Sequence, residues 1–160
     1  MEPCFIILPF LIFLVSFSAL WAFICILLSS IGGWKELASV YRYEGRFSGR
    51  RWRFRSCRMS RYVNYNNCLI FGAGTEGLYI NILPVFRIQH PPLLIPWSEI
   101  KKEKTKGMIF AYWKLSFARA SNTEIRLSAS LAEQIFDERN WRESPENSFD
   151  YRAYKKIEPH

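Results

Sequence analysis

The chain has 160 residues, of which 49% are hydrophobic, and its formal net charge is +8. One long apolar stretch lies near its start. The residues that remain are enough for one ordinary domain and too few for a second. The sequence contains no HExxH, no CxxC pair, no P-loop and no G-x-S-x-G motif. It therefore predicts neither a metal site nor a cofactor, and it argues against the enzyme classes that those motifs mark.

Residues 5–30 are predicted to form a transmembrane helix after a short N-terminal end, residues 1–4. From Phe5 to Leu28 there is no charged side chain, and the polar members are two serines. At about 1.5 Å per residue this stretch is about 36 Å long, enough to cross a hydrocarbon core of about 30 Å. A signal peptide would have a basic start, a shorter apolar run and a cleavage site. Membrane lipids are therefore the predicted partner of this helix.

Basic residues follow the helix but do not precede it. Glu2 opposes the amino terminus, whereas Lys35, Arg42 and Arg46 come soon after the apolar stretch. Basic residues close to a membrane helix are retained on the cytoplasmic side. The predicted location is the cell membrane in a single pass, with the amino terminus outside and residues 32–160 in the cytoplasm.

Residues 31–42 predict an amphipathic juxtamembrane helix. Glycines 32 and 33 should end the first helix, because glycine suits the left-handed cap conformation. Apolar side chains then recur with the i, i+3, i+4, i+7 spacing of one helix face. They are Trp34, Leu37, Ala38 and Tyr41.

Residues 43–141 predict a mainly β domain. Within the first strand, Trp52 and Phe54 should face inward between outward arginines, and a bulge should then shift the inward phase to Cys57 and Met59. Turn chemistry is expected at residues 64–67, NYNN, and in a hairpin turn at residues 75–77.

Prolines mark the middle of this domain. They restrict PPLLIPW, residues 91–97, to a short edge strand, and residues 101–107 should form a charged turn or strand end. An aromatic-rich strand over residues 108–117 and a turn over residues 118–123 follow.

The last predicted strand places Ile125 and Leu127 inward. Ser130 and Glu133 predict a capping box for a helix that runs to about residue 141. Residues 142–160 are polar and lack periodicity, so they are predicted to form a largely disordered tail.

About seven short strands followed by one helix is the order of elements in a pleckstrin-homology-like (PH-like) bent β-barrel. The resemblance is carried by LYINIL and IPWSEI, which are similar to segments of GRAM domains. The chain also resembles small uncharacterised bacterial single-pass membrane proteins with such a body, through YNNCL, GLY and HPPLLIPW. This resemblance implies a membrane-anchored, mainly β protein with a C-terminal capping helix, and no established activity comes with it. An unrelated small β-barrel is the alternative fold.

An arginine-rich block gives the first candidate binding surface. Eight arginines and one glutamate lie between residues 42 and 61, so most of the net charge is there. Such residues can bind anionic lipid headgroups at about 1 kcal/mol each, or they can serve as a topology signal alone. Arginines that alternate with aromatic residues could also bind nucleic acid, whose bases stack on aromatic rings. A domain tethered to a membrane makes nucleic acid the less favoured ligand. The candidates are Arg50, Arg51, Arg53 and Arg55.

The proline-rich strand gives a second candidate surface. As a docking edge it would offer Leu93, Leu94 and Trp97 to a membrane protein partner or to the bilayer. As a shielded edge strand it would serve the fold alone. The sequence thus favours a binding module without catalytic turnover. The alternatives are an enzyme with a site around His90, Glu99 and Cys68, or a purely structural interaction protein.

Overall fold

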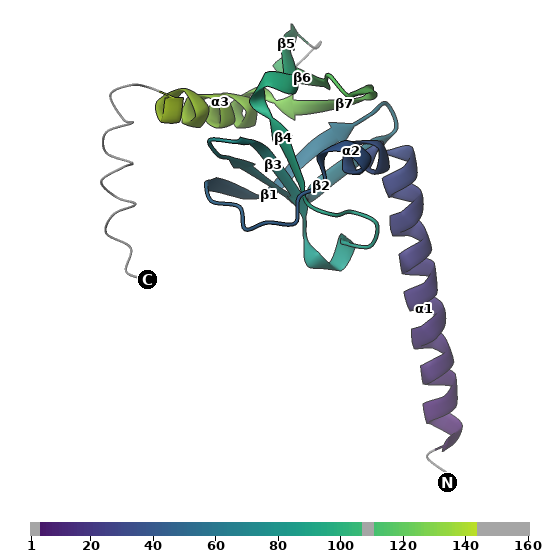
Figure 1. Ribbon diagram of the computed structural model, residues 1–160. Helices are drawn as coiled ribbons and strands as arrows, with labels where there is room; N and C mark the ends of the chain where they lie inside the picture. The colour runs from purple at the N-terminus through teal and green to yellow at the C-terminus, as the bar shows by residue number, and fades with distance from the viewer. Residues whose placement is uncertain (1–3, 107–110, 144–160) are drawn as a thin grey trace, which may run out of the picture.

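The computed structural model describes residues 4–106 and 111–143, with side chains for residues 7–105 and 111–140 (Figure 1). Two helices precede the strands, and a third helix follows them. In chain order the elements are α1 (Cys4–Ile31), α2 (Trp34–Tyr41), β1 (Arg50–Met59), β2 (Val63–Ala73), β3 (Gly77–Ile82), the 3-10 helix η1 (Pro84–Phe86), β4 (Leu93–Pro96), the 3-10 helix η2 (Trp97–Glu99), β5 (Ile100–Lys106), β6 (Ala111–Phe117), β7 (Ala120–Ser128) and α3 (Ala129–Glu143).

Helix α1 is long and apolar enough to cross a membrane. Within its apolar span, Ile7–Ile31, a stretch of 18 residues has a mean hydropathy of 2.7, and 6% of that stretch is buried. Figure 1 shows α1 extending away from the sheet, while α3 lies on the side of the domain that faces away from the start of α1. The apolar helix predicted over residues 5–30 is therefore confirmed as a helix of spanning length and composition.

Glycine allows the sharp corner between α1 and α2. Gly33 has φ of +82°, in the left-handed region that is costly for other residues. A Cβ at this position would lie 2.3 Å from Thr123 Oγ1. The predicted amphipathic helix is confirmed, and its apolar face packs into the domain through Trp34, Leu37 and Tyr41, each at most 3% exposed. A fragment starting at residue 43 would thus lack part of the core.

The seven strands form one antiparallel sheet in the order β4-β3-β2-β1-β7-β6-β5. The mainly β domain with a C-terminal helix is confirmed, but the described strands do not close into the expected barrel. The edge strands β4 and β5 follow each other through η2 without pairing. Strand β1 pairs with β7 only through Arg58 and Met59, so the sheet opens beside the rest of β1.

The core lies between this bent sheet and its helices. Leu131, Ala132 and Ile135 of α3 are at most 3% exposed, and α3 packs against β2, β6 and β7. Helix α2 packs against β4 and β7. The predicted inward side chains Ile125 and Leu127 are confirmed as buried.

Strand β1 departs from the simple alternation expected of it. Trp52 is buried, but Phe54 is 62% exposed and has φ of +55°, so its predicted inward position was wrong. The β1–β2 register shifts between Trp52 and Arg55 and again between Arg55 and Cys57. The predicted bulge exists, but it begins earlier than expected and turns Phe54 outward. Cys57 and Met59 are buried, as expected.

Two turn predictions had different outcomes. The hairpin between β2 and β3 is confirmed, because Gly74 N–H bonds the carbonyl of Gly77 across it. The turn predicted at residues 64–67 was wrong, since those residues belong to β2 and the chain reverses at residues 60–62. Buried Tyr65 and its pairing with β1 override the local turn propensity of the asparagines.

The edge-strand prediction for the proline-rich segment is confirmed by β4. The charged residues after it form strand β5, and β7 already begins at Ala120, inside the predicted turn. Helix α3 begins at Ala129, so Ser130 lies within the helix and is not its cap. The predicted tail over residues 142–160 was wrong for residues 142 and 143, which belong to α3. Residues 107–110 and 144–160 lie outside the described residues.

Candidate functional site

The predicted arginine residues do not form one site. Arg50 pairs with Glu138 of α3 at 3.3 Å, and a guanidinium N–H of Arg51 donates to the carbonyl of Phe47. Arg53 and Arg55 are exposed, and no ion pair or hydrogen bond to their side chains is present within the described part of the chain. These arginines thus form a spread of surface charge along β1, part of which is already used in structural contacts.

The predicted apolar docking edge is mostly core. Leu93 is fully buried, and Trp97 is 8% exposed while its Nε1 donates to the carbonyl of Gly74 at 2.8 Å. Leu94 is half-buried. Two of the three predicted contact residues, Leu93 of β4 and Trp97 of η2, are therefore unavailable to a partner, because both side chains pack into the core.

His90 lies in a buried aromatic cluster. Its Nδ1 faces the carbonyl of Ile88 at 2.8 Å, so Nε2 accepts from the hydroxyl of Tyr65 at 2.9 Å. The Trp34 ring lies edge-on to the imidazole, with the centroids 5.0 Å apart. Burial lowers the pKa of His90, against the opposing effect of nearby backbone carbonyls, and the neutral ring acts as a structural bridge.

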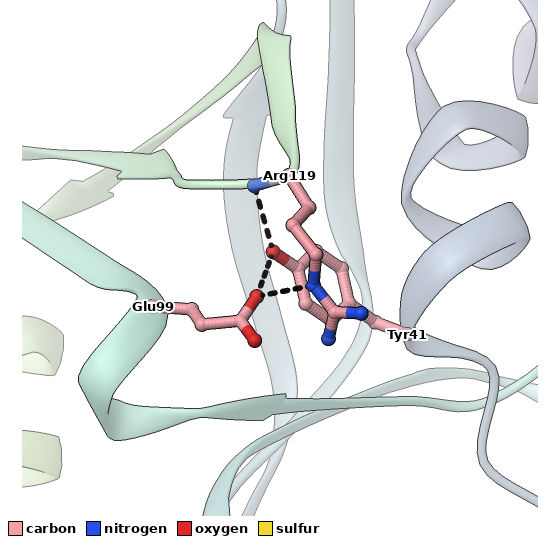
Figure 2. A network of polar contacts seen from close by, with 3 residues as sticks. All are labelled: Tyr41, Glu99 and Arg119. Atoms are coloured by element: carbon pink, nitrogen blue, oxygen red, sulfur yellow. Dashed lines mark hydrogen bonds and ion pairs between the residues drawn. The ribbon is translucent and has the colours of Figure 1, made fainter.

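Glu99 belongs to a different network, shown in Figure 2. Its carboxylate accepts from Arg119 Nε at 2.8 Å and from the hydroxyl of Tyr41 at 2.6 Å, and the Arg119 backbone N–H donates to that hydroxyl at 3.2 Å. The bonds from Arg119 and Tyr41 hold the pKa of Glu99 below its usual range. The network ties α2 to η2 and to the β6–β7 turn.

The enzyme alternative placed a site around His90, Glu99 and Cys68. Among the described side chains, these three residues do not belong to one contact network. Cys68 is a buried free thiol whose pKa is raised by burial, which disfavours the reactive thiolate. No cluster of three His, Cys, Asp or Glu side chains suited to a metal ion occurs in the part of the chain that the structure describes.

A cationic pocket lies between α2 and the η1 segment, which we define as residues 84–89. Its volume is about 460 Å³, and its lining contains no acidic residue among the described side chains. Three cations line it, Lys35 from α2, Arg42 from the end of α2 and Arg87 from the η1 segment. The other lining residues are Ala38, Ser39, Gln89 and Pro91.

The electrostatics of this pocket favour an anion. Glu44 pairs with Arg42 Nε at 2.9 Å, but both side chains are more than half exposed, so the pair is weak and other guanidinium N–H donors are available. Lys35 and Arg87 have no described ion pair in residues 7–105 and 111–140. Three cations around one cavity can together bind a phosphate or a carboxylate.

The pocket is held next to the end of α1. Ser29 Oγ of α1 donates to the carbonyl of Gln89 at 2.6 Å, and Trp34 Nε1 donates to the carbonyl of Pro91 at 3.0 Å. These bonds fix the η1 segment against the α1–α2 corner. The cations are thereby placed at the junction between the apolar helix and the domain.

Sequence reasoning did not single out this site. Lys35 was considered only as a topology signal, Arg42 as a topology signal and as one member of the arginine-rich block, and Arg87 was not considered. A signal was present, because Lys35, Ala38, Ser39 and Arg42 have the i, i+3, i+4, i+7 spacing of one face in the helix predicted over residues 31–42. The contribution of Arg87, which is distant in sequence, could not be read from that pattern.

Comparisons with protein-family models, with curated proteins and with solved structures find no match to this chain.

Proposed function

We propose that this protein is a single-pass membrane protein whose domain binds the headgroup of an anionic phospholipid in the pocket of Lys35, Arg42 and Arg87. The observation that carries this proposal is the position of the pocket beside the end of the apolar helix α1. Basic pockets next to membrane helices suit anionic headgroups, because each cation near the surface contributes about 1 kcal/mol. The chemistry needed is binding, with no catalytic turnover.

Two further parts of the proposal concern fold type and orientation. The strand order β4-β3-β2-β1-β7-β6-β5 followed by α3 supports a PH-like domain in an opened form. The basic residues that follow α1 support a cytoplasmic domain and an external amino terminus. The pocket would then bind headgroups of the inner leaflet, where anionic lipids give a negative surface potential.

The test uses the full-length protein in nanodiscs that contain phosphatidylcholine and phosphatidylglycerol, with retained lipid counted by native mass spectrometry. The wild type should retain phosphatidylglycerol in preference, and less of it as ionic strength rises above about 0.15 M. The variant Lys35→Gln/Arg42→Gln/Arg87→Gln should lose about 3 kcal/mol of binding free energy for phosphatidylglycerol, which lowers the affinity roughly a hundredfold.

A matched control removes the same charge elsewhere. Arg53, Arg55 and Lys101 are exposed and lack described ion-pair partners within residues 7–105 and 111–140, so their triple glutamine variant should fold and keep the lipid preference. Equal retention by the pocket variant and the wild type would refute the pocket. Loss in the control variant alone would instead assign headgroup binding to the surface of Arg53, Arg55 and Lys101.

A further inference from the structure

The η1 segment lies along the side of α1 and not beyond its end. Trp21 Nε1 donates to the carbonyl of Val85 at 3.1 Å, and the Trp21 ring lies 5.3 Å from that of Phe86. Ser29, two turns later on the same face, bonds Gln89. Figure 1 shows the segment around η1 protruding from the domain on the side toward which α1 extends.

The position of Trp21 on α1 gives the depth of this contact. Trp21 precedes Ile31 by ten residues, or about 15 Å along the axis. The part of α1 before it, residues 4–20, spans only about 25 Å, which is less than a hydrocarbon core of about 30 Å. Large apolar side chains also remain exposed on α1 after Trp21. They are Phe23, Ile24, Ile26, Leu27, Leu28 and Ile31.

A bilayer that covers those side chains must extend past Trp21. The η1 segment, which touches α1 at Trp21, is then at the level of the lipid. Its own surface is suited to that location, because Val85 is 66% exposed and Ile88 is 41% exposed. Its one charged residue, Arg87, lines the cationic pocket.

The backbone of the segment is also suited to a low-dielectric environment, where unpaired polar groups are costly. Several backbone carbonyls of the η1 segment accept hydrogen bonds from side chains of the protein and so do not need water as a donor. The pairs are Trp21 Nε1 to Val85, His90 Nδ1 to Ile88 and Ser29 Oγ to Gln89. Backbone N–H groups of Phe86 and Arg87 bond within the turn.

The geometry points to a second membrane contact: the η1 segment inserts beside α1 into the leaflet on the domain's side, with Val85 and Ile88 in contact with acyl chains. The occupant of this apolar surface is the lipid bilayer, because the surface is continuous with the exposed face of α1. This contact requires that α1 crosses the membrane, but it does not depend on which anion the pocket binds. It would hold the domain in one orientation relative to the bilayer.

The experiment places an environment-sensitive fluorophore at single cysteines of the full chain, reconstituted in liposomes, with Cys4 replaced by serine. The described native cysteines, Cys25, Cys57 and Cys68, are buried. Val85→Cys and Ile88→Cys are the test positions. Nitroxide-labelled phospholipids should quench both labels, and their emission should be shifted to the blue.

Two controls make the outcomes distinct. Gln134→Cys is exposed on α3, which lies away from the start of α1 in Figure 1, and its label should be quenched by aqueous iodide and not by the lipid nitroxide. Phe13→Cys, 63% exposed on α1, should be quenched by lipid nitroxide if α1 spans the membrane. Quenching at Phe13→Cys but not at Val85→Cys or Ile88→Cys would overturn the insertion alone. Disulfide-linked dimers through Val85→Cys would overturn it in favour of a second copy of the chain.

Discussion

Replacement of Gly33 by alanine should strongly destabilise the corner between α1 and α2. The left-handed conformation at φ of +82° costs a residue with a Cβ about 1–2 kcal/mol. The new Cβ would also lie 2.3 Å from Thr123 Oγ1 and 2.8 Å from its Cγ2. Thr123 is 1% exposed and its hydroxyl donates to Glu36 at 2.7 Å, so it cannot move freely. Overpacking of this kind adds about 1–3 kcal/mol.

We therefore expect Gly33→Ala to lower the free energy of unfolding by about 2–5 kcal/mol. The measurement is denaturant unfolding of the full-length protein in detergent micelles, followed by tryptophan fluorescence. Ser39→Ala on the exposed face of α2 is the control and should change stability by less than about 0.5 kcal/mol.

A double-mutant cycle separates the two costs of this substitution. Thr123→Ala removes the two nearest of the three atoms that the new Cβ would meet, so Gly33→Ala/Thr123→Ala should lose less stability than the sum of the single losses, with a coupling of about 0.5–3 kcal/mol. The backbone cost should persist in the double variant. Strictly additive losses would refute the close approach of Gly33 and Thr123, and a Gly33→Ala variant as stable as the wild type would refute the whole argument.

Three other outcomes follow from single residues. Because burial lowers the pKa of His90, the unfolded chain binds a proton that the folded protein excludes, so stability should fall as pH drops below about 6.5. His90→Gln should reduce that slope in unfolding measured across pH, and an unchanged slope would contradict the buried neutral ring. Phe54→Asn should raise the unfolding free energy by about 1 kcal/mol, since Phe54 is exposed at a left-handed position, and a loss of stability would show that its ring packs. Cys57 should resist alkylation until the domain unfolds, because burial raises the pKa of its thiol; rapid labelling of the folded protein at neutral pH would be inconsistent with this.

Several elements of this protein were determined by local sequence. The uncharged apolar run from Phe5 to Leu28 specifies a helix of membrane-spanning length, and the spacing of Trp34, Leu37 and Tyr41 specifies α2. The prolines around Leu93 restrict that strand to an edge. These features depend on periodicity and on missing backbone donors, which act over a few residues.

Other features were decided only by tertiary contacts. Alternation predicted Phe54 inside, but the pairing of β1 with β2 places a bulge there and turns it outward. The asparagines at 64 and 67 have turn propensity, yet Tyr65 between them is held in β2 by burial and by its bond to His90. Strand register depends on the partner strand, so a single strand's pattern does not fix it.

The candidate site shows the same division. Local sequence places Lys35 on α2 and Arg42 directly after its last residue. Arg87 reaches them only because Trp34, Ser29 and their backbone acceptors hold the η1 segment against the α1–α2 corner. The depth of that segment beside Trp21 likewise comes from contacts between parts of the chain that are far apart in sequence. The sequence by itself determined a helix of membrane-spanning length and composition, followed by a basic, mainly β domain. The position of its charges relative to that helix required the folded structure, because packing between distant segments determines it.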